Sequence, residues 1–209
     1  MKDLGCQVNA NCGYHIHCEV KDFCPSKMGV LLARWIKLEP FLCKLVPLMR
    51  VGNYYCKLIS RHKKLKPNRS YSALSLWKTL RPTNFGPHEN SQKKYTLNTV
   101  NFAAVCKKVM NKERKTIEFR LPEGTLEYDD VINWVRFFAN FVETSKSKAM
   151  PRNLHPVTTV DSFLKLAGLK ATNLCRLDED LEQTKAWVYK RLEKFNLVTI
   201  PLEIPELEH

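Results

Sequence analysis

The sequence contains no apolar run as long as the roughly 18 residues that a membrane-spanning helix needs, which argues against a membrane protein. Its first ten residues, MKDLGCQVNA, also lack the basic-then-apolar pattern of a secretory signal peptide. Because disulfides are rare in reducing compartments, the eight cysteines then predict reduced thiols in a cytoplasmic protein. The final LEH, residues 207–209, is typical of a purification-tag remnant and is left out of the fold prediction.

Acidic residues are scarce relative to basic ones, 21 against 34, which gives a net charge of +13. A basic protein attracts nucleotides, nucleic acids and other anions. The positive charge concentrates in residues 61–69 and 107–115, although each run is also typical of a solvated loop or helix face. Aromatic residues are not interleaved with these lysines as they are in single-strand binders. Nucleic-acid binding is therefore a secondary hypothesis.

The cysteines lack the spacing of a zinc knuckle. Cys6, Cys12, Cys18 and Cys24 are each separated by five residues, whereas the paired cysteines of structural zinc sites have about two to four between them. Successive residues of a strand point to opposite faces, so Cys12 and Cys18 would lie opposite the two histidines of CGYHIHCEV. Zinc is kept as an alternative, and nothing singles out one cysteine as a nucleophile.

The chain shows no internal repeat, and its patterning predicts an α+β fold with antiparallel strands and helices on one side. Ser26 is a plausible N-cap for the second element, which Pro40 ends or kinks, and Gly168 stands where a C-cap would be. The predicted domains are a core over 1–150 and a helical region over 151–205 that packs on it. The predicted elements are strands at 8–20, 94–102 and 115–121 and helices at 26–38, 72–80, 125–143, 158–169 and 178–195.

Two pairs of polar residues share a strand face. His15 and His17 project together from the first strand, and Glu118 and Arg120 project together from the strand KTIEFRLPEG. If both strands belong to one sheet, this face displays two imidazoles, a carboxylate and a guanidinium, which suits a nucleotide and a divalent cation. The alternatives are a solvated polar face for the histidines and a same-face ion pair for the other two residues.

Four segments, in order, resemble the amidoligase family of the glutamine-synthetase-like carboxylate–amine ligase superfamily. They are CGYHIHCEV (12–20), RVGNYYC (50–56), KKYTLNTVNF (93–102) and KTIEFRLPEGTLEYDDVINWVRFFANFVE (115–143). The tail, from VDSFLKLAGL onward, also resembles the end of that family, so the likeness covers about residues 5–195. The resemblance implies part of a curved, glutamine-synthetase-like antiparallel sheet.

The resemblance also implies an ATP-dependent ligase that joins a carboxylate to an amine through an acyl-phosphate, with Mg²⁺ on the ATP phosphates. It assigns two metal ligands, His15 and Glu118, and two catalytic groups, His17 and Arg120. Three residues match the intermediate motifs and are assigned, together with Arg120, to nucleotide or substrate binding: Arg50, Tyr95 and Asn98. The basic excursion over residues 61–92 favours an acidic substrate, such as a glutamyl group or a peptide C-terminus.

One feature of the family pattern is missing. Members of the family begin with a strand of the form G-x-E-x-E, whereas only Asp3 precedes the histidine pair as an acidic residue here. Three interpretations follow. The chain is the C-terminal portion of a longer ligase, or it is a subunit that another chain or a second copy completes. Alternatively, it is an inactive relative that serves as a binding or assembly module.

Overall fold

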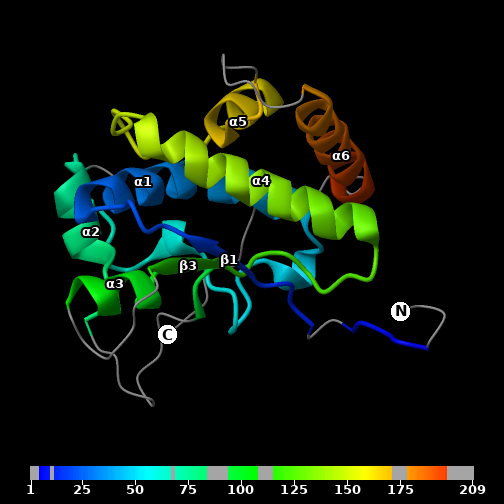
Figure 1. The fold of residues 1–209 in the computed structure, drawn as a ribbon, viewed down its shortest axis with the longest axis horizontal. Helices are drawn as coiled ribbons and strands as arrows, with labels where there is room; N and C mark the ends of the chain where they lie inside the picture. The colour runs from blue at the N-terminus through cyan, green and yellow to red at the C-terminus, as the bar shows by residue number, and fades with distance from the viewer. Residues whose placement is uncertain are drawn as a thin grey trace.

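A computed structural model describes residues 5–9, 12–66, 69–83, 94–107, 115–170 and 178–196 (Figure 1). The fold is mixed α+β, with a small antiparallel sheet and six α-helices in this part of the chain. No helix there is both long and apolar enough to cross a membrane. The elements are β1 (Ile16–Glu19), α1 (Pro25–Leu42), η2 (Cys43–Leu45), η3 (Leu48–Arg50), η4 (Ile59–Arg61), α2 (Ala73–Leu80), β2 (Leu97–Asn98), α3 (Val100–Cys106), β3 (Thr116–Phe119), α4 (Tyr128–Ser147), α5 (Val160–Ala167) and α6 (Asp178–Asn196).

The three strands pair in the order β1-β3-β2, so β3 is central. The register places Glu118 of β3 between His17 of β1 and Asn98 of β2. Because side chains alternate along a strand, the neighbours Ile117 and Phe119 point to the opposite face, where both are buried. The strand therefore has one apolar face in the core, and Glu118 lies on the opposite face, as its predicted pairing with Arg120 requires.

Helices α1 and α4 cover the apolar face of the sheet, and α5 and α6 lie on the outer side of α4 (Figure 1). Trp35 of α1 contacts Phe119 at 5.1 Å between ring centroids, and Phe138 of α4 stacks on Phe119 at 4.2 Å. Burying each such ring stabilises the fold by about 2–3 kcal/mol relative to leaving it in water. This aromatic layer fixes the strands from one side and leaves their polar face to the site.

Helix α4 packs against other elements on several sides, through buried residues that include Trp134, Phe137, Phe138 and Phe141. It packs against β1 and α1 on one side and against α5 and α6 on the other. The two helices beyond it follow their sequence signals closely. The Thr159 side chain caps α5 by accepting from the Ser162 N–H, and Gly168 ends it with a φ of 81°, which favours glycine.

Some predicted boundaries are wrong. Helix α1 begins at Pro25 with Cys24 as N-cap, not Ser26, because proline fits the first turn, where its missing N–H has no partner to lose. Pro40 lies inside α1 and the helix ends only two residues later, so one lost hydrogen bond near the end is tolerated.

The strand predicted over 94–102 is the largest error. Only Leu97–Asn98 is a strand, and α3 begins at Val100, because the Asn98 side-chain oxygen accepts from the Val100 N–H and turns the chain. In the described residues of the strand predicted over 8–20, which exclude 10 and 11, the pairing consists of β1 and an isolated bridge at Gly13. Predictions for residues 84–93, 108–114 and 197–209, the tag remnant included, lie outside the described residues.

Candidate active site

Glu118 is the centre of a polar cluster on the open face of the sheet. Its Oε1 lies 3.0 Å from His15 Nδ1, 2.5 Å from an Arg120 terminal nitrogen and 3.9 Å from His17 Nε2. The Asn98 side-chain amide donates to Oε2 at 2.7 Å. The structure thus brings together five of the seven site residues that the sequence predicts.

The Glu118 carboxylate is held ionised by these neighbours. Burial alone would raise its pKa, but hydrogen bonds from His15 and Asn98 and the charge of Arg120 outweigh burial and lower the pKa to about 2. The side chains differ in exposure: 10% for Glu118, 16% for Arg120, 38% for His15 and 53% for His17. The carboxylate is therefore an inner counter-ion, and the imidazoles form the side that a ligand can reach.

Arg50 supports this cluster from the backbone side. Its guanidinium is buried and donates to the carbonyl oxygens of Arg120, at 2.7 Å, and Leu121, at 3.3 Å. The Cys56 thiol contacts the same Arg120 carbonyl at 3.4 Å, and burial raises the pKa of this thiol to about 11, so it is inert at neutral pH. Arg50 thus fixes the position of the backbone at Arg120. The sequence shows that Arg50 is charged, but it does not show that the charge is used on backbone carbonyl groups.

Tyr95 lies apart from the cluster centre. It forms a bridge with Lys57, its ring lies 5.2 Å from that of His62, and burial raises the pKa of its hydroxyl. The short β2 explains this position, since only Leu97 and Asn98 pair with β3. Among the described residues, Tyr95 forms no hydrogen bond with Glu118, whose partners are His15, Arg120 and Asn98.

Gly13 permits the tight approach of two basic side chains. A Cβ atom at this position would lie 3.0 Å from both an Arg50 terminal nitrogen and His15 Nε2. The Gly13 backbone pairs with Glu123, which ties the segment before β1 to the loop after β3. The glycine therefore lets the first histidine pack beside Arg50.

The cluster has one unused donor and too few ligands for a metal ion. Arg120 Nε is buried without a hydrogen-bond partner. No group of three His, Cys, Asp or Glu side chains that could hold a metal ion occurs among the residues whose positions are described. Glu118 already accepts from His15, Arg120 and Asn98, and the adjacent guanidinium opposes a second cation. These residues suit an anion and do not by themselves fit Mg²⁺.

A family model described as "putative amidoligase enzyme" matches residues 1–142, more than half of the chain. The chain belongs to the amidoligase family. No curated protein and no solved structure matches it. The amidoligase match contains all seven predicted site residues, from His15 to Arg120, and it ends within α4.

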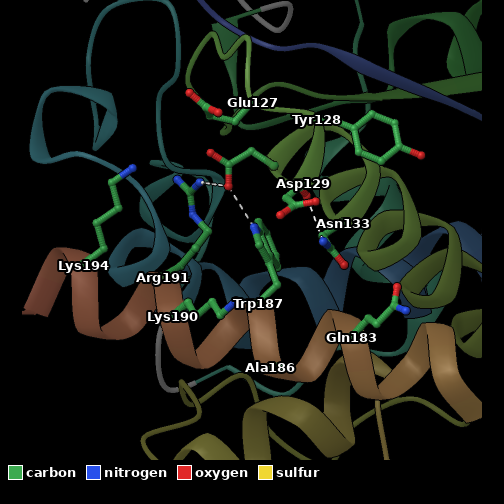
Figure 2. Close-up of a pocket in the computed structure, with 11 residues that line it drawn as sticks. Glu127, Tyr128, Asp129, Asn133, Gln183, Ala186, Trp187, Lys190, Arg191 and Lys194 are labelled. Atoms are coloured by element: carbon green, nitrogen blue, oxygen red, sulfur yellow. Dashed lines mark hydrogen bonds and ion pairs between the residues drawn. The ribbon is translucent and has the colours of Figure 1, made fainter.

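A separate pocket of about 730 Å³ lies between the start of α4, which is inside the amidoligase match, and α6, which is outside it (Figure 2). None of the seven predicted site residues lines it. Its floor is buried Arg191, which bonds Asp130 at 2.8 Å, Glu123 and, at 2.6 Å, the Leu45 carbonyl oxygen. Trp187 Nε1 also donates to Asp130, at 2.8 Å. Arg191 thereby joins α6 to the loop that follows Arg120, a contact between distant segments that no local sequence signal indicates.

Proposed function

We propose that this amidoligase-family chain is the catalytic part of an ATP-dependent carboxylate–amine ligase. In the proposed reaction, a substrate carboxylate oxygen attacks the γ-phosphorus of ATP and ADP leaves. The amine nitrogen of a second substrate then attacks the acyl carbon of the acyl-phosphate, inorganic phosphate leaves, and an amide bond and a proton result. Family membership supports a ligase in general, and the polar cluster supports the phosphoryl step.

The observation that carries this proposal is the cationic surface around one buried carboxylate. Phosphoryl transfer depends chiefly on positioning and on neutralising negative charge. Arg120 offers a buried Nε donor that has no partner, which a phosphoryl oxygen would satisfy. His17 is the most exposed member of the cluster and would contact the same group from the β1 side.

Glu118 and Asn98 have a positioning role in this proposal. Two of the groups that would face the anion, Arg120 and His15, are held by Glu118 Oε1, and Asn98 holds Oε2. A guanidinium that is already oriented loses little conformational freedom when it binds an anion. Glu118 would thus set the direction of the cations.

Magnesium and the carboxylate and amine substrates are part of the proposal and need contributions from elsewhere. His15 and Glu118 cannot complete a Mg²⁺ shell, so further oxygen ligands would come from the ATP phosphates and from acidic residues of another segment, a partner chain or a second copy. In this proposal β1, β2 and β3 are part of a larger curved sheet of the glutamine-synthetase type. The basic surface would favour an acidic carboxylate substrate.

Calorimetric titration with ATP tests the proposal, first in a buffer that contains Mg²⁺ and then in one that contains EDTA. We expect Arg120→Gln to weaken ATP binding by about tenfold, since a hydrogen-bonded charge pair contributes roughly 1.5–3 kcal/mol. Arg136→Gln is the matched control, because Arg136 forms its ion pair with Asp180 away from the cluster. If wild type and Arg120→Gln bind ATP with equal affinity, the proposed site is refuted. If the protein binds ATP but releases no ADP with any carboxylate and amine, it is a binding module and not a ligase.

A further inference from the structure

Exposed apolar side chains concentrate in one short stretch beside the polar cluster. Nine large hydrophobic residues are exposed in the described part of the chain, and four of them fall within residues 48–55. Among these, the rings of Tyr54 and Tyr55 are 59% and 66% exposed. They contact each other edge to face, with 5.0 Å between ring centroids. Single exposed apolar side chains are common on protein surfaces, whereas adjacent exposed rings are typical of a binding surface.

Local hydrogen bonds hold the two rings in place. Gly52 turns the chain with a φ of 69°, a conformation that other residues rarely adopt. The Asn53 side-chain oxygen then accepts from the Tyr55 N–H at 2.9 Å, and the Asn53 carbonyl accepts from the Cys56 N–H at 3.0 Å. The rings are thus displayed by a structured turn, which lowers the entropic cost of binding.

The same turn is attached directly to the site. Arg50 and Cys56, on either side of the two tyrosines in sequence, both contact the carbonyl oxygen of Arg120. Arg50 and Cys56 are both buried, so the aromatic turn is fixed to the chain at Arg120 by two inner contacts. The position of the tyrosines is therefore tied to the backbone that carries the Arg120 side chain.

Two lysines add positive charge beside the rings. The ammonium group of Lys94 lies 3.6 Å from the Tyr54 ring centroid, and that of Lys57 lies 5.6 Å from it. Lys94 also donates to the Tyr54 hydroxyl, and this bond lowers the pKa of the phenol. Neither lysine has a carboxylate partner within the described ranges. Since both lysines are directed at Tyr54, the more exposed Tyr55 ring is the one without a lysine beside it in the described ranges.

We propose that Tyr55, supported by Tyr54, stacks on the base of the bound nucleotide, and that Lys57 and Lys94 face its ribose and phosphates. The inference rests on the proposed ATP-dependent function and adds the residues that recognise the base. Any base can stack on an aromatic side chain, and this contact contributes measurably to the affinity. Lysine binds phosphate as a point charge.

The test compares ATP with inorganic tripolyphosphate, which has the charges but no base. We expect Tyr55→Ala to weaken ATP binding by about tenfold and to leave tripolyphosphate binding unchanged. Tyr55→Phe and Tyr55→Trp keep the ring and should restore ATP binding. Tyr189→Ala, which removes an exposed tyrosine from α6, is the matched control and should have no effect.

The outcomes separate this inference from the function on which it rests. Arg120→Gln should weaken ATP and tripolyphosphate alike, and failure of wild type to bind either would overturn the proposed function. ATP binding that is unchanged in Tyr55→Ala overturns the inference alone. So does an equal loss of tripolyphosphate binding in that variant, because the substitution would then act through Cys56 and Arg120. Self-association that Tyr55→Ala abolishes, with ATP affinity unchanged, would identify the tyrosines as a contact between copies instead.

Discussion

The pH dependence of stability should reveal the buried Glu118 carboxylate. We consider Glu118→Gln, which keeps the size of the side chain and removes its charge. In the native protein the pKa of Glu118 is lowered to about 2 from an ordinary value of 4.5. A carboxyl group whose pKa is depressed by folding contributes stability above its unfolded pKa and loses it as the pH falls toward the folded value.

The magnitude follows from these two values. At 1.36 kcal/mol per pKa unit, the difference between 4.5 and about 2 corresponds to roughly 3 kcal/mol of stability at pH 7. Linkage then predicts that about 2 kcal/mol of this is already lost at pH 3. The side chain is only 10% exposed, so solvent screening reduces the value little.

Urea unfolding, followed by tryptophan fluorescence between pH 7 and pH 3, measures the effect. We expect Glu118→Gln to be less stable than wild type by about 2–3 kcal/mol at pH 7 and by about 1 kcal/mol at pH 3. The matched control is Glu19→Gln, an exposed glutamate on β1. Curves for wild type and Glu118→Gln that stay parallel over the whole range would show that the carboxylate is not stabilised by its neighbours as described.

Two further substitutions test how the cluster is held. Gly13→Ala should push His15 away from Arg50, since the new Cβ would lie 3.0 Å from both; the His15 imidazole resonances in NMR should shift, and unchanged resonances would contradict the close approach. Arg191→Met leaves Asp130 and Glu123 without their buried partner and should lower the free energy of unfolding by about 3–5 kcal/mol. The exposed pair lost in Arg136→Met should cost less than about 1 kcal/mol, so comparable losses in thermal or urea unfolding would refute the role of Arg191.

Local patterning predicts which side chains share a face, and it does so well here. Alternation alone places His15 and His17 on one face of their strand, and Glu118 and Arg120 on one face of theirs. The antiparallel pairing of β1 with β3 then brings the two pairs together on the same face of the sheet. The apolar residues of α4, among them Trp134, Phe137, Phe138 and Phe141, likewise predict that this part of the helix is buried. These predictions succeed because period and polarity are properties of a few consecutive residues.

Contacts between distant segments are less accessible to such reasoning. That Arg50 serves the Arg120 backbone depends on the path of η3 past the sheet, and nothing in its own segment specifies it. Tyr95 shares a motif with Asn98, but the strand is too short to present both residues to Glu118. One side-chain hydrogen bond, which the Asn98 oxygen accepts from the Val100 N–H, ends β2 after two residues, although the surrounding residues favour a longer strand.

The Arg191 contacts have a consequence for how the protein opens. When α6 detaches, Arg191 releases Glu123, whose backbone pairs with Gly13 two residues before the first histidine. Local unfolding of α6 and loss of order around the cluster should therefore occur as one cooperative event. In hydrogen exchange, the amides of β1 should exchange faster when α6 is deleted. A recombinant fragment cut at residue 142, where the family match ends, would keep every predicted site residue and lose the helix that stabilises their arrangement.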